Sequence, residues 1–130
     1  MILTAGNYFS PEANREYMSV SQYKSFETCQ EMAMAEIEGK WQRPMSTALL
    51  VGSYVDAHFE GTLDIFRAQH PEIIKKDGNL KSEYQQADEI IGRLERDRLF
   101  MDYMSGRKQV ILSGEIAGVK IKIKALYIFN

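Results

Sequence analysis

The spacing of apolar and polar residues changes once along the chain, and this change predicts the fold class. From Ser19 to about residue 104, apolar side chains recur every three or four positions, as on one face of an amphipathic helix. From Gln109 onward the period falls to two, which is typical of β-strands with one buried face. We therefore expect an α+β fold, with a helical N-terminal two-thirds followed by a C-terminal antiparallel β-hairpin.

The helical part is expected to span residues 19–106, after an N-terminal arm of residues 1–18 that contains one short turn. Ser19 and Ser21 suit the N-cap of a first long helix, and Gly39 suits its end. Further helices are predicted at 46–59, 62–69, 80–96 and 99–104. A chain of 130 residues is too short for two average domains, so one domain is expected over 1–130.

The hairpin, at residues 107–128, has a register that can be predicted from its two-residue turn, Ala117-Gly118. This register sets Leu112 opposite Ile123 and collects the large aliphatic residues on one face of the hairpin, the aliphatic face (Val110, Leu112, Ile116, Val119, Ile121 and Ile123). The other face, the lysine face, carries Glu115, Lys120, Lys122 and Lys124. We expect the aliphatic face to pack on the helices, the lysine face to contact water, and the hairpin edge to be open to a partner.

Composition excludes several classes of protein. Hydrophobic residues make up 45% of the chain and charged residues 26%, and a formal charge of -2 argues against a nucleic-acid binder that works through global charge. The single cysteine, Cys29, cannot form an internal disulfide or a thiolate-held cluster. We therefore expect Cys29 to be a small residue of the core. No apolar run approaches the roughly 20 residues that span a bilayer, and no signal peptide is recognisable, so a cytoplasmic protein is expected.

The segment 52–60 holds the candidate chemistry. Asp56 and Glu60 are four residues apart, so on a helix their carboxylates share one face and could hold a hard divalent cation. The alternative interpretation, a solvated acidic face, is the commoner reason for such a pair. His58 points about 200° around the helix from Asp56 and is interpreted as a surface or boundary residue.

Two motifs and four further segments resemble a known family. Tyr17–Cys29 (YMSVSQYKSFETC) resembles the opening Ser-x-Ser helix of RecB-like nucleases of the PD-(D/E)XK class. Gly52-x-x-x-Asp56-x-x-x-Glu60 is similar to their Gly-x-x-x-His-x-x-x-Glu helix, with Asp56 where many relatives carry histidine. The chain also resembles phage and prophage nuclease-like proteins, described as exodeoxyribonuclease VIII-like or RecE-like, at 46–64, 71–74, 81–96 and 100–109.

The resemblance implies a catalytic centre of which this sequence contains only part. In the family, an aspartate ends the second strand and an Asp/Glu-x-Lys follows on a third strand, where these groups bind Mg²⁺ or Mn²⁺ and orient the attacking water. Ala125 or Leu126 stands at the aspartate position, and the sequence reaches Asn130 before any Asp/Glu-x-Lys. Asp56 and Glu60 would then be vestigial, so no catalytic residue and no cofactor are expected.

The candidate binding residues lie in the hairpin and directly after it. Lys120, Lys122 and Lys124 form a basic strip, which either serves solubility and edge protection or contacts DNA phosphates or a partner. Tyr127 and Phe129 continue the apolar pattern and are candidates for docking into a neighbouring protein.

Three hypotheses of function follow. The leading one is a non-catalytic phage or mobile-element protein that binds a host defence protein or nucleoprotein complex in the bacterial cytoplasm, as an inhibitor of a system such as a CRISPR effector (an anti-CRISPR). The first alternative is a fragment or variant of a metal-dependent phage DNA exonuclease used in recombination, with Mg²⁺ or Mn²⁺ as cofactor. The second is a self-associating structural module that forms a homodimer through the open hairpin edge.

Overall fold

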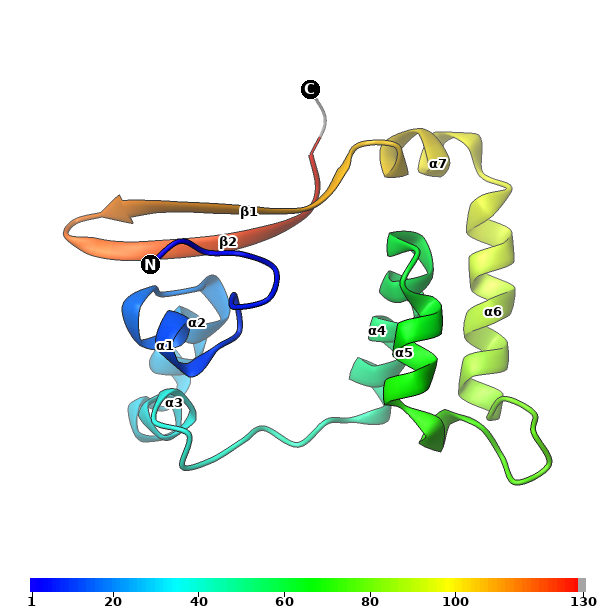
Figure 1. The fold of residues 1–130 in the computed structure, drawn as a ribbon, viewed down its shortest axis with the longest axis horizontal. Helices are drawn as coiled ribbons and strands as arrows, with labels where there is room; N and C mark the ends of the chain where they lie inside the picture. Colours follow the sequence, from blue (N-terminus) through cyan, green and yellow to red (C-terminus); the bar gives the residue numbers. More distant parts are fainter. Residues whose placement is uncertain (129–130) are drawn as a thin grey trace. The chain divides into compact units, whose positions relative to one another are not determined.

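The computed structural model describes residues 1–128, and the chain divides into two compact units. The first unit comprises Met1–Pro44 together with the chain from Arg107 onward, and the second comprises Met45–Gly106. Figure 1 shows helices in both units and the antiparallel hairpin in the first. This arrangement of helices followed by a hairpin confirms the α+β class.

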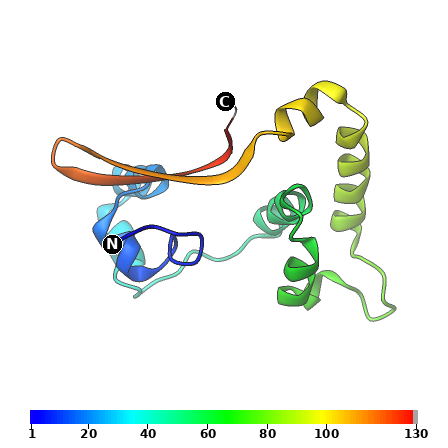
Figure 2. The same cartoon turned by 45° about the horizontal axis from the view of Figure 1, so that its top comes forward.

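The first unit contains three short helices and the hairpin (Figures 1 and 2). Its helices are α1 (Pro11–Glu16), α2 (Val20–Thr28) and α3 (Gln30–Ile37). Its strands are β1 (Arg107–Ile116) and β2 (Val119–Ile128). The short turn expected in the N-terminal arm is therefore α1.

The helix expected from Ser19 to Gly39 is two helices, α2 and α3. Ser19 begins α2 as predicted: its side chain accepts from the Gln22 amide at 3.3 Å, and the Gln22 side chain accepts from the Ser19 amide at 2.8 Å. The break lies at Cys29, whose backbone is extended with φ -158° and ψ 109°. Cys29 is also exposed, so its prediction as a core residue was wrong; Ala33 is the buried residue of α3.

The hairpin has the predicted register. Ile116 pairs with Val119, Leu112 with Ile123 and Val110 with Ala125. The turn residues Ala117 and Gly118 have φ values of 51° and 79°, and this pair of positive values matches a type I′ turn, whose twist suits two antiparallel strands.

The predicted orientation of the hairpin is wrong, because the lysine face is the face that packs inside the first unit. Lys122 is 2% exposed, whereas Leu112, Ile116, Val119 and Ile123 are 42–64% exposed. The N-terminal arm lies beside β2 (Figure 1), and Met18 of the arm forms a bridge to Ile121. Periodicity separated the two faces correctly, but it cannot state which face a distant segment will cover.

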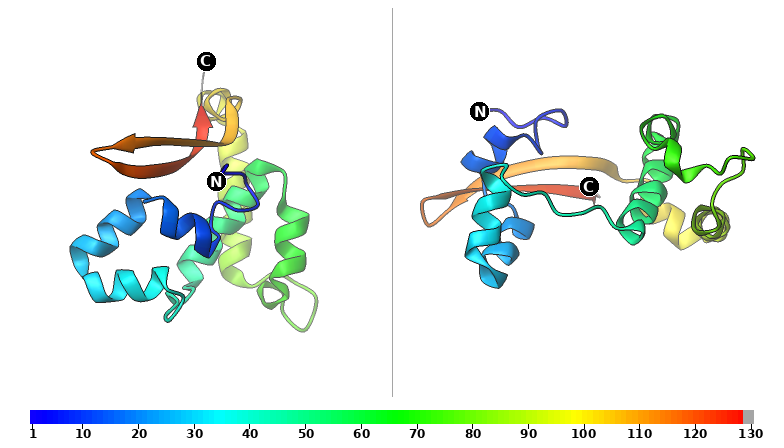
Figure 3. Two further views of the ribbon diagram at one scale, coloured as in Figure 1. Left: turned by 60° about the vertical axis from the view of Figure 1, so that its left-hand side comes forward. Right: turned by 90° about the horizontal axis from the view of Figure 1, so that it is seen from below.

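The second unit is a helical cluster. Its elements are α4 (Thr47–Glu60), α5 (Leu63–Gln69), a 3-10 turn η1 (Pro71–Ile73), α6 (Ser82–Glu95) and α7 (Arg98–Met104). All four predicted helices of this part are therefore confirmed to within a few residues. In Figure 3, α4 and α6 run beside each other.

The core of the second unit lies between α4, α5 and α6. It consists of fully or nearly buried side chains from these helices and from η1: Leu50, Tyr54, Ala57, Phe66, Ile73, Tyr84, Ala87 and Ile91. Val51, Val55 and Phe59 of α4 are partly buried and pack against this cluster. Within residues 1–128, no helix is both long enough and apolar enough to cross a bilayer.

Candidate functional site

The paired carboxylates, Asp56 and Glu60, lie in the last turns of α4. Ser46 caps the start of this helix by accepting from the Leu49 amide, and Gly61 ends it with a left-handed φ of 79°. Asp56 is exposed and Glu60 is half-buried. The predicted arrangement of two carboxylates one helical turn apart is therefore present.

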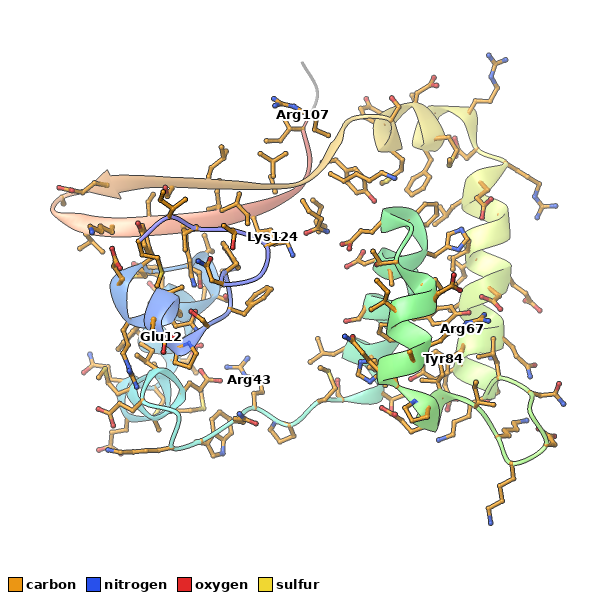
Figure 4. All side chains as sticks on the ribbon, in the orientation of Figure 1. Glu12, Arg43, Arg67, Tyr84, Arg107 and Lys124 are labelled. Atoms are coloured by element: carbon orange, nitrogen blue, oxygen red, sulfur yellow. The ribbon has the colours of Figure 1, made fainter. Side chains whose placement is uncertain are left out.

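A polar network around the buried Tyr54 side chain links α4 to its neighbouring helices. The Tyr54 hydroxyl donates to Asp88 Oδ1 at 2.6 Å and accepts from Arg67 Nη2 at 3.2 Å, which joins α4 to α6 and α5. Figure 4 shows Arg67 and Tyr84 among these helices. Burial, together with the bond to Asp88, raises the pKa of the Tyr54 phenol. Sequence analysis missed this network because its members are 13 and 34 residues from Tyr54 in the chain.

His58 lies on a different face of α4 and does not join the acidic pair. Its Nε2 lies 2.8 Å from Oε1 of Glu95 on α6, and its side chain is 34% exposed. The prediction of a boundary residue is confirmed. The contact gives α4 and α6 a second polar link on the solvent side of the helix pair.

The described residues do not form a complete metal centre. Across residues 1–128, no group of three or more histidine, cysteine, aspartate or glutamate side chains is placed to hold a metal ion. Asp56 and Glu60 supply carboxylate oxygens, which Mg²⁺ and Mn²⁺ prefer, but two carboxylates from one helix leave most of an octahedral shell to other donors. The residues present therefore fit part of a metal site and not the whole of one.

The three candidate lysines each contact an aromatic ring of the N-terminal arm. Lys120 Nζ lies 5.6 Å from the Tyr17 ring centroid, Lys122 Nζ 4.6 Å from that of Tyr8, and Lys124 Nζ 5.4 Å from that of Phe9. Figure 4 shows Lys124 beside the arm. These are cation–π contacts. The three aromatic residues could have indicated these contacts from the sequence. The arm has no helical or strand periodicity, so local secondary structure does not account for aromatic residues there.

Hydrogen bonds strengthen two of these contacts. Lys120 Nζ donates to Glu16 Oε1 at 2.8 Å, and this bond lowers the pKa of Glu16 and raises that of Lys120. Lys122 Nζ donates to the Tyr8 carbonyl at 2.5 Å and to Asn14 Oδ1 at 2.7 Å. Burial lowers the pKa of Lys122.

These contacts change the interpretation of the basic strip. Lys122 is enclosed by protein and is not available to a DNA phosphate in this structure, so the expected wet strip is wrong at its centre. Lys120 is 51% exposed on its side chain, and Lys124 is half-buried; their role in binding stays a prediction. Tyr127 is half-buried near the end of β2, and Phe129 lies outside the described residues.

The fold of this chain is similar to that of a protein whose structure has been solved. The chain is 53% identical to the protein in the "Crystal structure of Putative exonuclease" from Eubacterium rectale, with a TM-score of 0.94. The match covers 98% of this chain and 50% of that one, so the chain spans about half the length of that relative. The comparison with curated proteins found no match.

Residues 19–129 match the family described as "PDDEXK-like domain of unknown function" (DUF3799). This range begins at the Ser19 cap of α2, includes the Asp56–Glu60 pair on α4 and continues through both hairpin strands. The match therefore agrees with the resemblance drawn from the motifs. The chain belongs to this family of PD-(D/E)XK nuclease-like domains.

Proposed function

We propose that this chain supplies the helical part and the first hairpin of a metal-dependent DNA exonuclease. The observation that carries the proposal is the 53% identity, over nearly all of the chain, to half of a protein described as a "Putative exonuclease". Asp56 and Glu60 on α4 are the residues that would contribute to its metal centre. Mg²⁺ or Mn²⁺, when bound, would polarise the phosphodiester and activate water.

In this proposal the chain hydrolyses DNA only together with further residues. Two carboxylates on one helix do not complete a metal shell, and Ala125 and Leu126, shortly before the end of β2 at Ile128, stand where the resemblance implies an aspartate. The half of the E. rectale protein that this chain does not match is the natural source of additional groups.

The test is a single fused polypeptide in which this chain replaces the matching half of the E. rectale protein. We expect it to digest linear double-stranded DNA with Mg²⁺ or Mn²⁺. Glu60→Gln should reduce the rate at least about 100-fold, since a metal ligand would be lost. Glu89→Gln on the exposed side of α6 is the matched control and should leave the rate unchanged. A fusion that binds DNA but cleaves none with either metal would contradict the proposal.

A second proposal is that the chain acts by binding alone, as a phage or mobile-element inhibitor of a host defence complex such as a CRISPR effector. Its basis is in the sequence, where Ala125 and Leu126, which cannot ligate a metal, stand at the position at which the resemblance implies an aspartate. Target cleavage by a purified CRISPR effector, measured with and without the chain, tests it directly. Inhibition by the chain, combined with a fusion that is inactive on DNA, would favour this proposal over the exonuclease.

A further inference from the structure

Three arginines around the junction of α6 and α7 have no partner inside the protein. Arg93 lies in the last turn of α6, Arg96 is the C-cap of that helix, and Arg98 is the first residue of α7. All three are exposed, and within residues 1–128 none of their guanidinium groups takes part in an ion pair, a hydrogen bond or a ring contact. In a chain whose formal charge is -2, they form a local group of unused cations.

The acidic residues that alternate with these arginines contact other groups. Glu95 Oε1 lies 2.8 Å from His58 Nε2 on α4. Asp97 is the N-cap of α7 and accepts from the Phe100 amide at 3.0 Å. The two nearest carboxylates therefore hold the helices in place, and the arginines remain directed to solvent.

Helix stabilisation explains only part of this arrangement. A cation near the C-terminus of a helix complements the partial negative charge there, which accounts for Arg93 and Arg96. Arg98 lies instead in the first turn of α7, where the partial charge is positive and a cation is unfavourable. An external anion bound at the junction would offset that cost, whereas no contact inside the described chain does.

Arg93 and Arg96 line one shallow hollow on the exposed side of α6, together with Glu89, Ile90 and Gly92. Gly92 has no side chain, and a Cβ placed there would meet no atom within 4 Å, so the surface beside the two arginines is open. Within residues 1–128, Glu89 forms no ion pair with either arginine. Its carboxylate would repel a phosphate, so Glu89 is not part of the proposed contact.

The three arginines lie at the same end of the helical cluster as the acidic pair of α4. His58, which stands between the two acidic residues in the sequence, contacts Glu95 at the end of α6. The next residue, Phe59, has its ring centroid 5.4 Å from that of Phe100 on α7. Figure 1 shows α7 directly after this end of α6. A DNA molecule that brings one phosphate to the acidic pair therefore has further phosphates near the arginines.

We propose that Arg93, Arg96 and Arg98 bind the phosphate backbone of the DNA beside the acidic pair. A guanidinium group donates two parallel hydrogen bonds to phosphate oxygens, which makes arginine well suited to this ligand. Backbone contacts position DNA without reading its sequence, so binding should show no sequence preference. This inference rests on the proposed function and names the residues that hold its DNA substrate.

The test measures DNA binding by the complete 130-residue chain in EDTA, where no metal-dependent cleavage occurs. Fluorescence anisotropy of a labelled linear duplex gives the Kd at several salt concentrations. Combining Arg93→Gln, Arg96→Gln and Arg98→Gln should raise Kd at least about tenfold. The slope of log association constant against log salt concentration should fall by about two to three, because each lost phosphate contact contributes about 0.9.

The matched control combines Lys75→Gln, Lys76→Gln and Lys81→Gln. These lysines are also exposed residues of the second unit, and their replacement removes the same total charge. The control should keep Kd within about twofold of wild type, because charges away from the bound phosphates are screened by salt. Circular dichroism checks that both triple variants keep the fold.

Three results would overturn the inference. One is that the wild-type chain binds no duplex at low salt. Another is that the two triple variants weaken binding equally with an unchanged fold, since the effect would then belong to net charge. The third is that poly-glutamate binds more tightly than the duplex and loses its binding in the arginine variant, which would assign the arginines to an acidic protein partner. Binding is measured without metal, so a fused protein that binds DNA but cleaves none contradicts the exonuclease proposal and not these contacts.

Discussion

Lys122 lies over the ring of Tyr8, and its ammonium nitrogen also donates to the carbonyl oxygen of that same residue. The nitrogen is 4.6 Å from the ring centroid and 2.5 Å from the carbonyl oxygen, and it makes a further bond of 2.7 Å to Asn14 Oδ1. The side chain is thereby enclosed by the N-terminal arm, more than 100 residues earlier in the chain. This lysine therefore helps to hold the arm on β2, together with the Lys120–Glu16 bond and the Met18–Ile121 bridge.

Replacing Lys122 should therefore loosen the arm. Lys122→Met keeps the length of the side chain but leaves the Tyr8 carbonyl and Asn14 Oδ1 without their donor, so we expect a loss of about 2 kcal/mol in the free energy of unfolding. Urea denaturation followed by circular dichroism measures it. Lys120→Met, at the exposed end of the same face, is the matched control and should cost much less. Equal losses in the two variants would contradict a special role for Lys122.

Tyr54→Phe tests the polar network that holds α4. The variant removes the bond to Asp88 and the acceptor for Arg67, so we expect a loss of about 1–2 kcal/mol at neutral pH. Tyr84→Phe, which also changes a buried ring of this core but leaves the Asp88 and Arg67 contacts in place, should cost less. Similar unfolding midpoints in urea for the two variants would show that the network contributes little.

The same tyrosine predicts a dependence of stability on alkaline pH. The pKa of Tyr54 is raised in the folded state, so the unfolded chain releases the phenolic proton first as pH rises. The stabilisation is therefore complete below the ordinary tyrosine pKa of about 10 and is lost as pH rises through the higher folded value. Unfolding midpoints between pH 8 and 11 should fall less steeply for Tyr54→Phe than for wild type. Parallel curves would contradict the shift.

Ser19 and Ser21 differ in role, although both belong to the Ser-x-Ser motif. Ser19→Ala removes the capping box of α2 and should lower stability by about 1 kcal/mol. Ser21 contributes only a 3.1 Å contact between its hydroxyl and that of Ser19. Ser21→Ala should therefore lower the free energy of unfolding by at most a few tenths of a kcal/mol. Thermal unfolding followed at 222 nm compares them, and the reverse order would refute the assignment of the cap.

Ala117 is the strained residue of the hairpin turn, since its φ of 51° is unfavourable for a residue with a Cβ. Ala117→Asn should stabilise the protein by about 0.5–1 kcal/mol, because asparagine tolerates this conformation and Asn-Gly favours type I′ turns. Ala117→Val should destabilise it, because a β-branched side chain tolerates positive φ poorly. If both changes shift the melting temperature in the same direction, the turn assignment is wrong.

The sequence determined those features that depend on neighbouring residues. The helices around Asp56 and Tyr84 follow from apolar residues at helical spacing, and the strand register follows from the two-residue turn at Ala117-Gly118. The family followed from the Ser19 and Glu60 motifs and agrees with the match over residues 19–129. In each case the signal spans one helix or one hairpin, which is the range over which local spacing controls conformation.

Only the tertiary structure decided which surfaces are covered. Alternation along β2 separates Lys122 from Ile123, but both possible orientations of the hairpin satisfy that pattern equally. The choice depends on where the aromatic residues of the N-terminal arm pack, and those contacts join residues more than 100 positions apart. The Tyr54–Asp88–Arg67 network has the same origin, since its members come from three different helices. Both the orientation of the hairpin and this network are selected by packing between distant segments, which no periodicity along the chain records.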